Sequence, residues 1–179
     1  MKSKKQPLKI SSPIFLIATV FGIGKIPFMP GTFGALIAAL EFTIYLKLVG
    51  LTLIFPYLIH IGIFLLLGLV AAHYYCKNTD NEDPSEVVID EYIGQYIAQI
   101  ICFIFCSFYI EKLATSYLLI IISFLFFRLF DIGKIGIVGY CDKNIKGAVG
   151  IILDDVVAAI IASAFAIISL ILINLFFYA

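Results

Sequence analysis

Charged residues are scarce in this sequence of 179 residues, since they make up only 13% of it. A soluble domain usually carries about 25% charged residues, and a chain of this length could not bury a composition that is 63% hydrophobic. The solvent around most of the chain is therefore predicted to be lipid. The 12 basic residues are balanced by 12 acidic ones, so the chain has no basic surplus of the kind that binds nucleic acid.

The sequence also lacks several well-defined catalytic motifs. Its four cysteines are Cys76, Cys102, Cys106 and Cys141. They form no CxxC pair and no Cys/His metal spacing, so they are predicted to be small packing residues. No GxxxxGK(S/T) loop, Cys-x₅-Arg or DxDx(T/V) pattern is present. The missing motifs disfavour a cysteine or an aspartyl nucleophile. His60 and His73 lie in apolar sequence without a partner motif, which also disfavours a histidine nucleophile.

Long apolar stretches predict an all-α, polytopic membrane helix bundle of about five spans. The stretches run from about Phe33 to Val49, Thr52 to Tyr75, Val87 to Ser107, Leu113 to Phe130 and Ile151 to Phe177. An earlier apolar run, Ile10–Gly22, is too short to span and lacks a cleavage site, which predicts an interfacial or re-entrant segment. The chain is thus predicted to be one membrane-embedded domain, with residues 1–32 as the interfacial segment and its Gly/Pro turn and residues 33–179 as the bundle.

The connections between these stretches predict how the chain is oriented. Two are very short, whereas Gly22–Thr32, Cys76–Glu86 and Asp131–Gly150 are long and polar. With five spans, the three long connections fall on the same side as the N-terminus. That side also carries ten of the 12 Lys and Arg residues, which makes it the cytoplasmic side by the positive-inside rule.

Acidic residues gather on this same side, although the positive-inside rule concerns only Lys and Arg. Four of them are embedded in apolar sequence: Asp90, Glu91, Asp154 and Asp155. Ionisable groups at membrane depth face a bundle interior or a wet cavity, and they usually mark a functional site. Gln95 and Gln99 continue from Glu91 at helical spacing, so this polar stripe is predicted to face the interior.

Local patterns account for some acids and leave others unexplained. Asp83, Pro84 and Glu86 have the spacing of a capping box with proline at the first helical position, which predicts that the third span begins there. Asp90 and Glu91 would then lie one to two turns inside the helix, where capping cannot explain them.

A second acidic pair, Asp154 and Asp155, enters the fifth span. Adjacent carboxylates repel one another unless a cation lies near, and a helix dipole explains only one of them. Alanines follow both residues at helical spacing, and small residues allow close helix packing. The acidic end of this span is therefore predicted to point into the bundle.

Basic residues and glycines flank these acids. Arg128 and Asp131 are three residues apart, which fits either a local ion pair or a place in the site. The glycine-rich strip that follows carries Lys134, Asp142, Lys143 and Lys146. Near the N-terminus, Lys25 precedes a Gly/Pro turn that leads into the first span. Gly31 allows close approach to this turn, and Thr32 is predicted to cap the first span. Free N–H groups at such a helix start suit an anion such as phosphate.

These features together suit Mg²⁺-assisted chemistry on a phospholipid phosphate at headgroup level. The predicted metal ligands are Asp90, Glu91, Asp154 and Asp155. The predicted phosphate contacts are Lys25, Gly31, Thr32, Arg128, Lys134, Lys143 and Lys146. Because no side-chain nucleophile stands out, metal-activated water is the predicted attacker.

A resemblance to a known family rests on three sequence blocks. They are Pro27–Gly34 (PFMPGTFG), Asp83–Gln95 (DPSEVVIDEYIGQ) and Phe127–Ala158, which contains FRLFDIGK and GIILDDVVA. In order and spacing they resemble the phosphatidylglycerophosphatase A family. One departure is that Ile135 and Gly136 follow Lys134, where the family usually has Pro-Trp.

The resemblance implies a bacterial inner-membrane, Mg²⁺-dependent enzyme that removes the terminal phosphate of phosphatidylglycerophosphate to give phosphatidylglycerol. It also implies a catalytic acidic core of Asp90, Glu91, Asp131, Asp154 and Asp155. Three alternatives stay open: a transporter or channel with acidic intramembrane groups, a phospholipid synthase of the CDP-alcohol type, and a non-catalytic scaffold. The absence of DGxxAR disfavours the synthase, and polar residues clustered at one membrane face disfavour the transporter.

Overall fold

The computed structural model describes residues 12–49 and 54–177, and this part of the chain is helical and contains no strand. Its helices are α1 (Pro13–Ala18), the 3₁₀ helix η1 (Ile23–Lys25), α2 (Pro30–Val49), α3 (Phe55–Thr79), α4 (Ile89–Tyr109), α5 (Glu111–Ala114), α6 (Tyr117–Gly133), α7 (Ile137–Asn144) and α8 (Gly147–Phe177). The predicted all-α bundle is confirmed.

Within the described residues, four helices are long and apolar enough to cross a membrane: α2, α3, α4 and α8. The fourth predicted span, from Leu113 to Phe130, is divided between α5 and α6. Ser116 caps α6 by accepting a hydrogen bond from the Leu119 N–H at 3.4 Å. With 17 residues, α6 is about 25 Å long, which is less than the ~30 Å bilayer core. The count of five crossings therefore stays a prediction.

Two predicted helix starts are wrong. Because α2 begins at Pro30, Thr32 lies within its first turn and does not cap it. The helix α4 begins at Ile89 rather than at the predicted capping box, so Asp90 lies in its first turn. Glu86 instead accepts hydrogen bonds from Lys25 and Tyr75, which hold the pKa of its carboxyl below the ordinary value.

The short N-terminal helices are tied to the segment before α4. The Val88 N–H donates to the Ala18 carbonyl oxygen at 2.9 Å, and Gly24 lies so close to the Glu86 carbonyl that a Cβ would not fit. These contacts explain why the chain stays non-helical up to Val88. They also fix the position along the bundle at which α4 begins.

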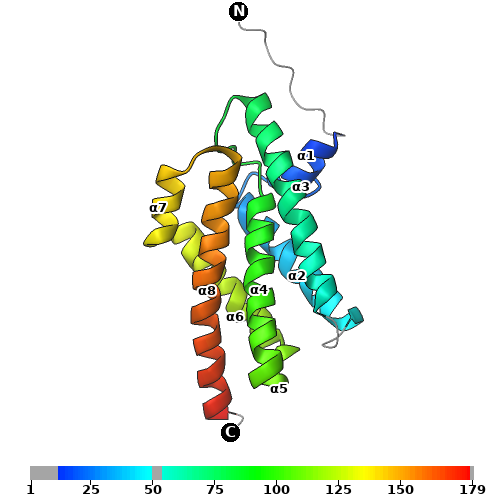
Figure 1. Ribbon diagram of the computed structural model, residues 1–179, viewed down its shortest axis with the longest axis vertical. Helices are drawn as coiled ribbons and strands as arrows, with labels where there is room; N and C mark the ends of the chain where they lie inside the picture. The colour runs from blue at the N-terminus through cyan, green and yellow to red at the C-terminus, as the bar shows by residue number, and fades with distance from the viewer. Residues whose placement is uncertain (1–11, 50–53, 178–179) are drawn as a thin grey trace, which may run out of the picture.

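The three long polar connections lie toward one end of the bundle. Figure 1 shows the first residues of α2, α4 and α8 and the last residues of α3 and α6 in the upper half of the view, with α7 beside α8. This arrangement agrees with the shared side that the sequence predicts for the three polar connections.

The helix α4 lies between α2, α6 and α8 and packs most closely on α8. A Cβ on Gly94 would lie 2.6 Å from the Phe127 ring and 3.0 Å from the Asp155 carbonyl oxygen, so only glycine fits. Gln95 and Gln99 are fully buried, as the polar stripe predicted. This close packing places the acids of α4 and α8 next to each other.

Candidate active site

A pocket of about 670 Å³ opens where α2, α4, α6 and α8 meet. Its ionisable lining residues are Glu82, Asp83, Asp90, Glu91, Arg128, Asp131, Lys134, Asp142, Lys146, Asp154 and Asp155. Gly31 and Thr32 line it from the first turn of α2. Acids predicted from three separate stretches of sequence therefore share one pocket.

Three carboxylates of the pocket lie close together. Asp90, Glu91 and Asp155 each place one oxygen within 4.8 Å of the others. Among the described residues, each also has a buried oxygen without a hydrogen-bond partner: Asp90 Oδ1, Glu91 Oε2 and Asp155 Oδ2. Buried carboxylates left without partners are costly unless a cation compensates them, and an all-oxygen donor set suits Mg²⁺. The residues present therefore fit a divalent ion.

Gly31 allows Glu91 to enter this cluster. A Cβ built on Gly31 would overlap the Glu91 carboxylate, with the carboxyl carbon at 2.6 Å and Cγ at 3.3 Å. The Glu91 carboxylate thus occupies the space that a side chain at position 31 would fill. The sequence predicted Gly31 as a phosphate contact, whereas its closest neighbour is a predicted metal ligand.

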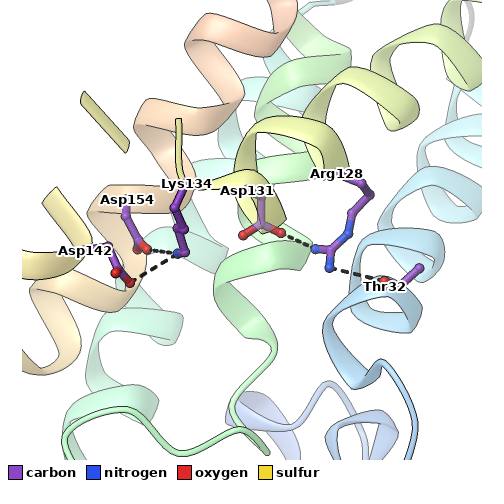
Figure 2. A network of polar contacts seen from close by, with 6 residues as sticks. All are labelled: Thr32, Arg128, Asp131, Lys134, Asp142 and Asp154. Carbon is purple, nitrogen blue, oxygen red and sulfur yellow. Dashed lines mark hydrogen bonds and ion pairs between the residues drawn. The ribbon is translucent and has the colours of Figure 1, made fainter. Parts of the chain in front are cut away.

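Arg128 connects α6 to α2 at the edge of the pocket. Its Nη1 pairs with Asp131, and its Nη2 donates to Thr32 Oγ1 at 3.2 Å, as Figure 2 shows. The predicted i, i+3 ion pair is present, and it also lines the pocket. A guanidinium held on two sides is oriented before any ligand arrives.

For the phosphate release that the sequence resemblance implies, replacing Thr32 with valine is expected to lower kcat/KM about tenfold, because Arg128 loses one of its two anchors. Thr43→Val is the matched control, since the Thr43 hydroxyl donates only to Ala39 in its own helix. Steady-state assays of both variants test this. Equal activities for the two variants would contradict a positioning role for Thr32.

Lys134 forms the second basic contact and caps α6 in the left-handed conformation, with φ 45°. Its Nζ donates to Asp154 and lies 3.4 Å from Asp142 Oδ1 (Figure 2). Burial alone would lower the pKa of Lys134, but the hydrogen bond to Asp154 and the nearby charges of Asp155 and Asp131 raise it above its ordinary value. Lys134 therefore stays charged beside the acids.

The other residues predicted for the site differ in whether they line the pocket. Asp154 lines the pocket, with one oxygen on Lys134 and Oδ1 buried without a partner. Lys146 lines the pocket as well, but Lys25 and Lys143 do not. Lys25 pairs with Glu86 instead, and Lys143 is exposed on α7.

Asn81 and Ser85 are among the lining residues that were not predicted to belong to the site. They lie in the connection between α3 and α4, where their polarity looked like ordinary loop sequence. The only available signal was that this connection borders Asp90, which is too general to single them out.

The fold and the pocket define the class: this is an α-helical integral membrane protein with an acidic site at one end of the bundle. The family model for phosphatidylglycerophosphatase A matches residues 16–170. The chain belongs to the phosphatidylglycerophosphatase A family, and it is a lipid phosphatase.

Curated relatives match most of the chain. Phosphatidylglycerophosphatase A of Escherichia coli K12 is 30% identical over 159 residues, covering 89% of this chain and 84% of the relative. The Haemophilus influenzae protein of that name is 33% identical over 167 residues, covering 89% and 92%. A Bacteroides thetaiotaomicron relative, provisionally named a phosphatidylinositol-3-phosphatase, is 35% identical over 147 residues, covering 81% and 86%. No solved structure matches the chain.

Proposed function

We propose that the protein hydrolyses the terminal phosphate of phosphatidylglycerophosphate, giving phosphatidylglycerol and inorganic phosphate, at the cytoplasmic face of a bacterial inner membrane. The family and two relatives named for this activity support the substrate. The positive-inside pattern supports the orientation. The observation that carries the chemistry is the cluster of Asp90, Glu91 and Asp155, which shares a pocket with two fixed basic side chains.

In this proposal Asp90, Glu91 and Asp155 hold Mg²⁺, and Asp154 is a candidate fourth ligand through its unpartnered oxygen. A Mg²⁺ ion held by these residues would supply charge neutralisation of the phosphate oxygens and a lowered pKa of water, so that a nucleophile would be available at neutral pH. The donor set supports this choice, because hard cations prefer carboxylate oxygens.

The chain's own residues bind and orient the phosphate. Arg128 and Lys134 both line the pocket and contact the nonbridging oxygens, where negative charge develops as water attacks phosphorus and the bond to the glycerol oxygen breaks. Asp131 and Thr32 hold the guanidinium, and Asp154 holds the ammonium group. Groups held in this way need little reorganisation in the transition state.

Purified protein in mixed micelles is expected to release phosphate from phosphatidylglycerophosphate with Mg²⁺, to stop when EDTA removes the ion, and to recover when Mg²⁺ is restored. Colorimetric phosphate determination measures this directly. No release with Mg²⁺ present would refute the substrate, and release that persists under chelation would refute the metal.

Phosphatidylinositol 3-phosphate is a second candidate substrate, because the Bacteroides relative shares 35% of aligned residues with this chain. The same assay should include this lipid at equal mole fraction. A higher kcat/KM for phosphatidylglycerophosphate is expected. The reverse order would assign the site to the inositol lipid.

A further inference from the structure

A second hollow lies beside the active-site pocket and plays no part in the chemistry described above. This lateral groove has a volume of about 440 Å³ and runs between α3 and the start of α8. Its lining residues are Leu69, Val70, His73, Tyr74, Lys146, Gly147, Ala148 and Val149. Lys146 and Gly147 also line the active-site pocket, so the two spaces adjoin at these residues.

The polarity of the lining side chains changes along the groove. Its polar lining includes Lys146, which the active-site pocket shares, and His73, which lies closer than Leu69 and Val70 to the end of α3 near the start of α8; Leu69, Val70, Ala148 and Val149 are apolar. Val70 and Val149, on opposite walls, are 51% and 56% exposed. Both walls belong to helices that are long and apolar enough to cross a membrane. Val70 lies inside the α3 stretch, whereas Val149 lies in the first turn of α8, nearer the headgroups. A ligand that matches this gradient has an anionic part next to an acyl chain.

Lys146 differs from the other basic residues of the pocket. Arg128 pairs with Asp131, and Lys134 pairs with Asp154 and Asp142. In the described part of the chain, Lys146 has no carboxylate within ion-pair distance, and its Nζ donates only to the Asp142 carbonyl oxygen, at 2.9 Å. An ammonium group has three N–H donors, so Lys146 keeps donors and a full charge for an anion.

We propose that the lateral groove binds the lipid half of the substrate, with Lys146 contacting the bridging phosphodiester and the walls from α3 and α8 contacting the first part of an acyl chain. This inference rests on the proposed function. The phospholipid substrate has two phosphates, and the structure offers two kinds of basic group for them. Arg128 and Lys134 serve the terminal phosphate beside the carboxylates, and Lys146 serves the bridging phosphate at the junction. The lipid thus reaches the site sideways, with its tail still in the bilayer.

Blocking the groove tests this proposal. Val149→Trp and Val70→Trp fill it from opposite walls, and both sites are exposed enough to accept the larger ring. Ile160→Trp on α8 and Leu66→Trp on α3 are matched controls, because both are exposed on the same helices and neither lines the active-site pocket or the lateral groove. Each variant is assayed with dioleoyl phosphatidylglycerophosphate and with the acyl-free headgroup, glycerophosphoglycerol phosphate.

The ratio of kcat/KM for the diacyl substrate to that for the acyl-free one is expected to fall roughly tenfold in each groove variant, the effect of losing about two buried methylenes. The ratio should stay at the wild-type value in Ile160→Trp and Leu66→Trp. An unchanged ratio in the groove variants, or an equal fall in the controls, would overturn the proposal. If one groove variant fails to fold, the variant on the opposite wall still tests the proposal.

The charge of Lys146 is tested separately. Lys146→Met is expected to raise KM about tenfold for both substrates with kcat nearly unchanged, since both contain the bridging phosphodiester and a charged hydrogen bond is lost. An unchanged KM, or a loss confined to kcat, would overturn this assignment. Absence of phosphate release by the wild type would instead refute the proposed function, so the two failures are distinguishable.

Discussion

Asp155→Asn and Asp90→Asn are each expected to reduce phosphate release by roughly a thousandfold or more, because metal-assisted charge stabilisation supplies several kcal/mol. Both carboxylates belong to the cluster, and each has a buried oxygen that accepts no hydrogen bond from residues 12–49 or 54–177. The amide keeps the size of the side chain but removes the charge that holds the ion. Phosphate-release assays on membranes with equal amounts of each variant measure the loss.

Glu111→Gln is the matched control for these variants. It makes the same kind of charge change on α5, away from the pocket-lining residues, and Glu111 is exposed. Binding of Mn²⁺ to purified protein, followed by electron paramagnetic resonance, gives a second readout that does not depend on turnover. Full activity in both aspartate variants, or undiminished Mn²⁺ binding, would rule out the proposed metal site.

Gly31→Ala is expected to lower kcat about a hundredfold and to raise the Mg²⁺ concentration needed for half-maximal activity, because displacing a ligand by about 1 Å has effects of this size. The added methyl group would occupy the position of the Glu91 carboxylate. Alanine has a higher helix propensity than glycine, so the fold of α2 should not suffer. A titration of activity against Mg²⁺ measures both effects.

Two comparisons make this test specific. Gly62→Ala, in α3, should have no effect, since a Cβ there would meet nothing within 4 Å. Glu91→Asp shortens the displaced side chain, so the double variant Gly31→Ala/Glu91→Asp should be more active than the product of the two single effects predicts. Simple multiplicativity would mean that Gly31 does not act through Glu91.

The acids of the pocket could be recognised from the sequence because the signal is the energetic cost of placing a charge in apolar surroundings. That signal requires no knowledge of the fold. A carboxylate in apolar sequence is costly, so Asp90, Glu91, Asp154 and Asp155 stood out without any model of the fold. The structure places all of them along one pocket. The sequence could not show that Lys134 would take one oxygen of Asp154, because that contact joins α8 to the end of α6.

Local patterns misled where distant contacts decide the outcome. The spacing of Asp83, Pro84 and Glu86 fits a capping box, yet Lys25 and Tyr75 bind the Glu86 side chain. Lys25 comes from a segment 61 residues away in sequence, which no local pattern can include. The same limitation made Lys25 look like a phosphate contact.

The length of α8 links the site to the bilayer. With 31 residues it is about 46 Å long, well beyond a hydrocarbon core of ~30 Å. If its far end spans the core, its first turns stand among the headgroups, and Asp154 and Asp155, about two turns in, lie near the boundary. A thicker membrane would draw these carboxylates toward hydrocarbon, where hydration is poorer. Hydrophobic mismatch is therefore expected to affect the turnover rate, so that under the proposed function the acyl composition of the membrane would influence how fast the lipid product forms.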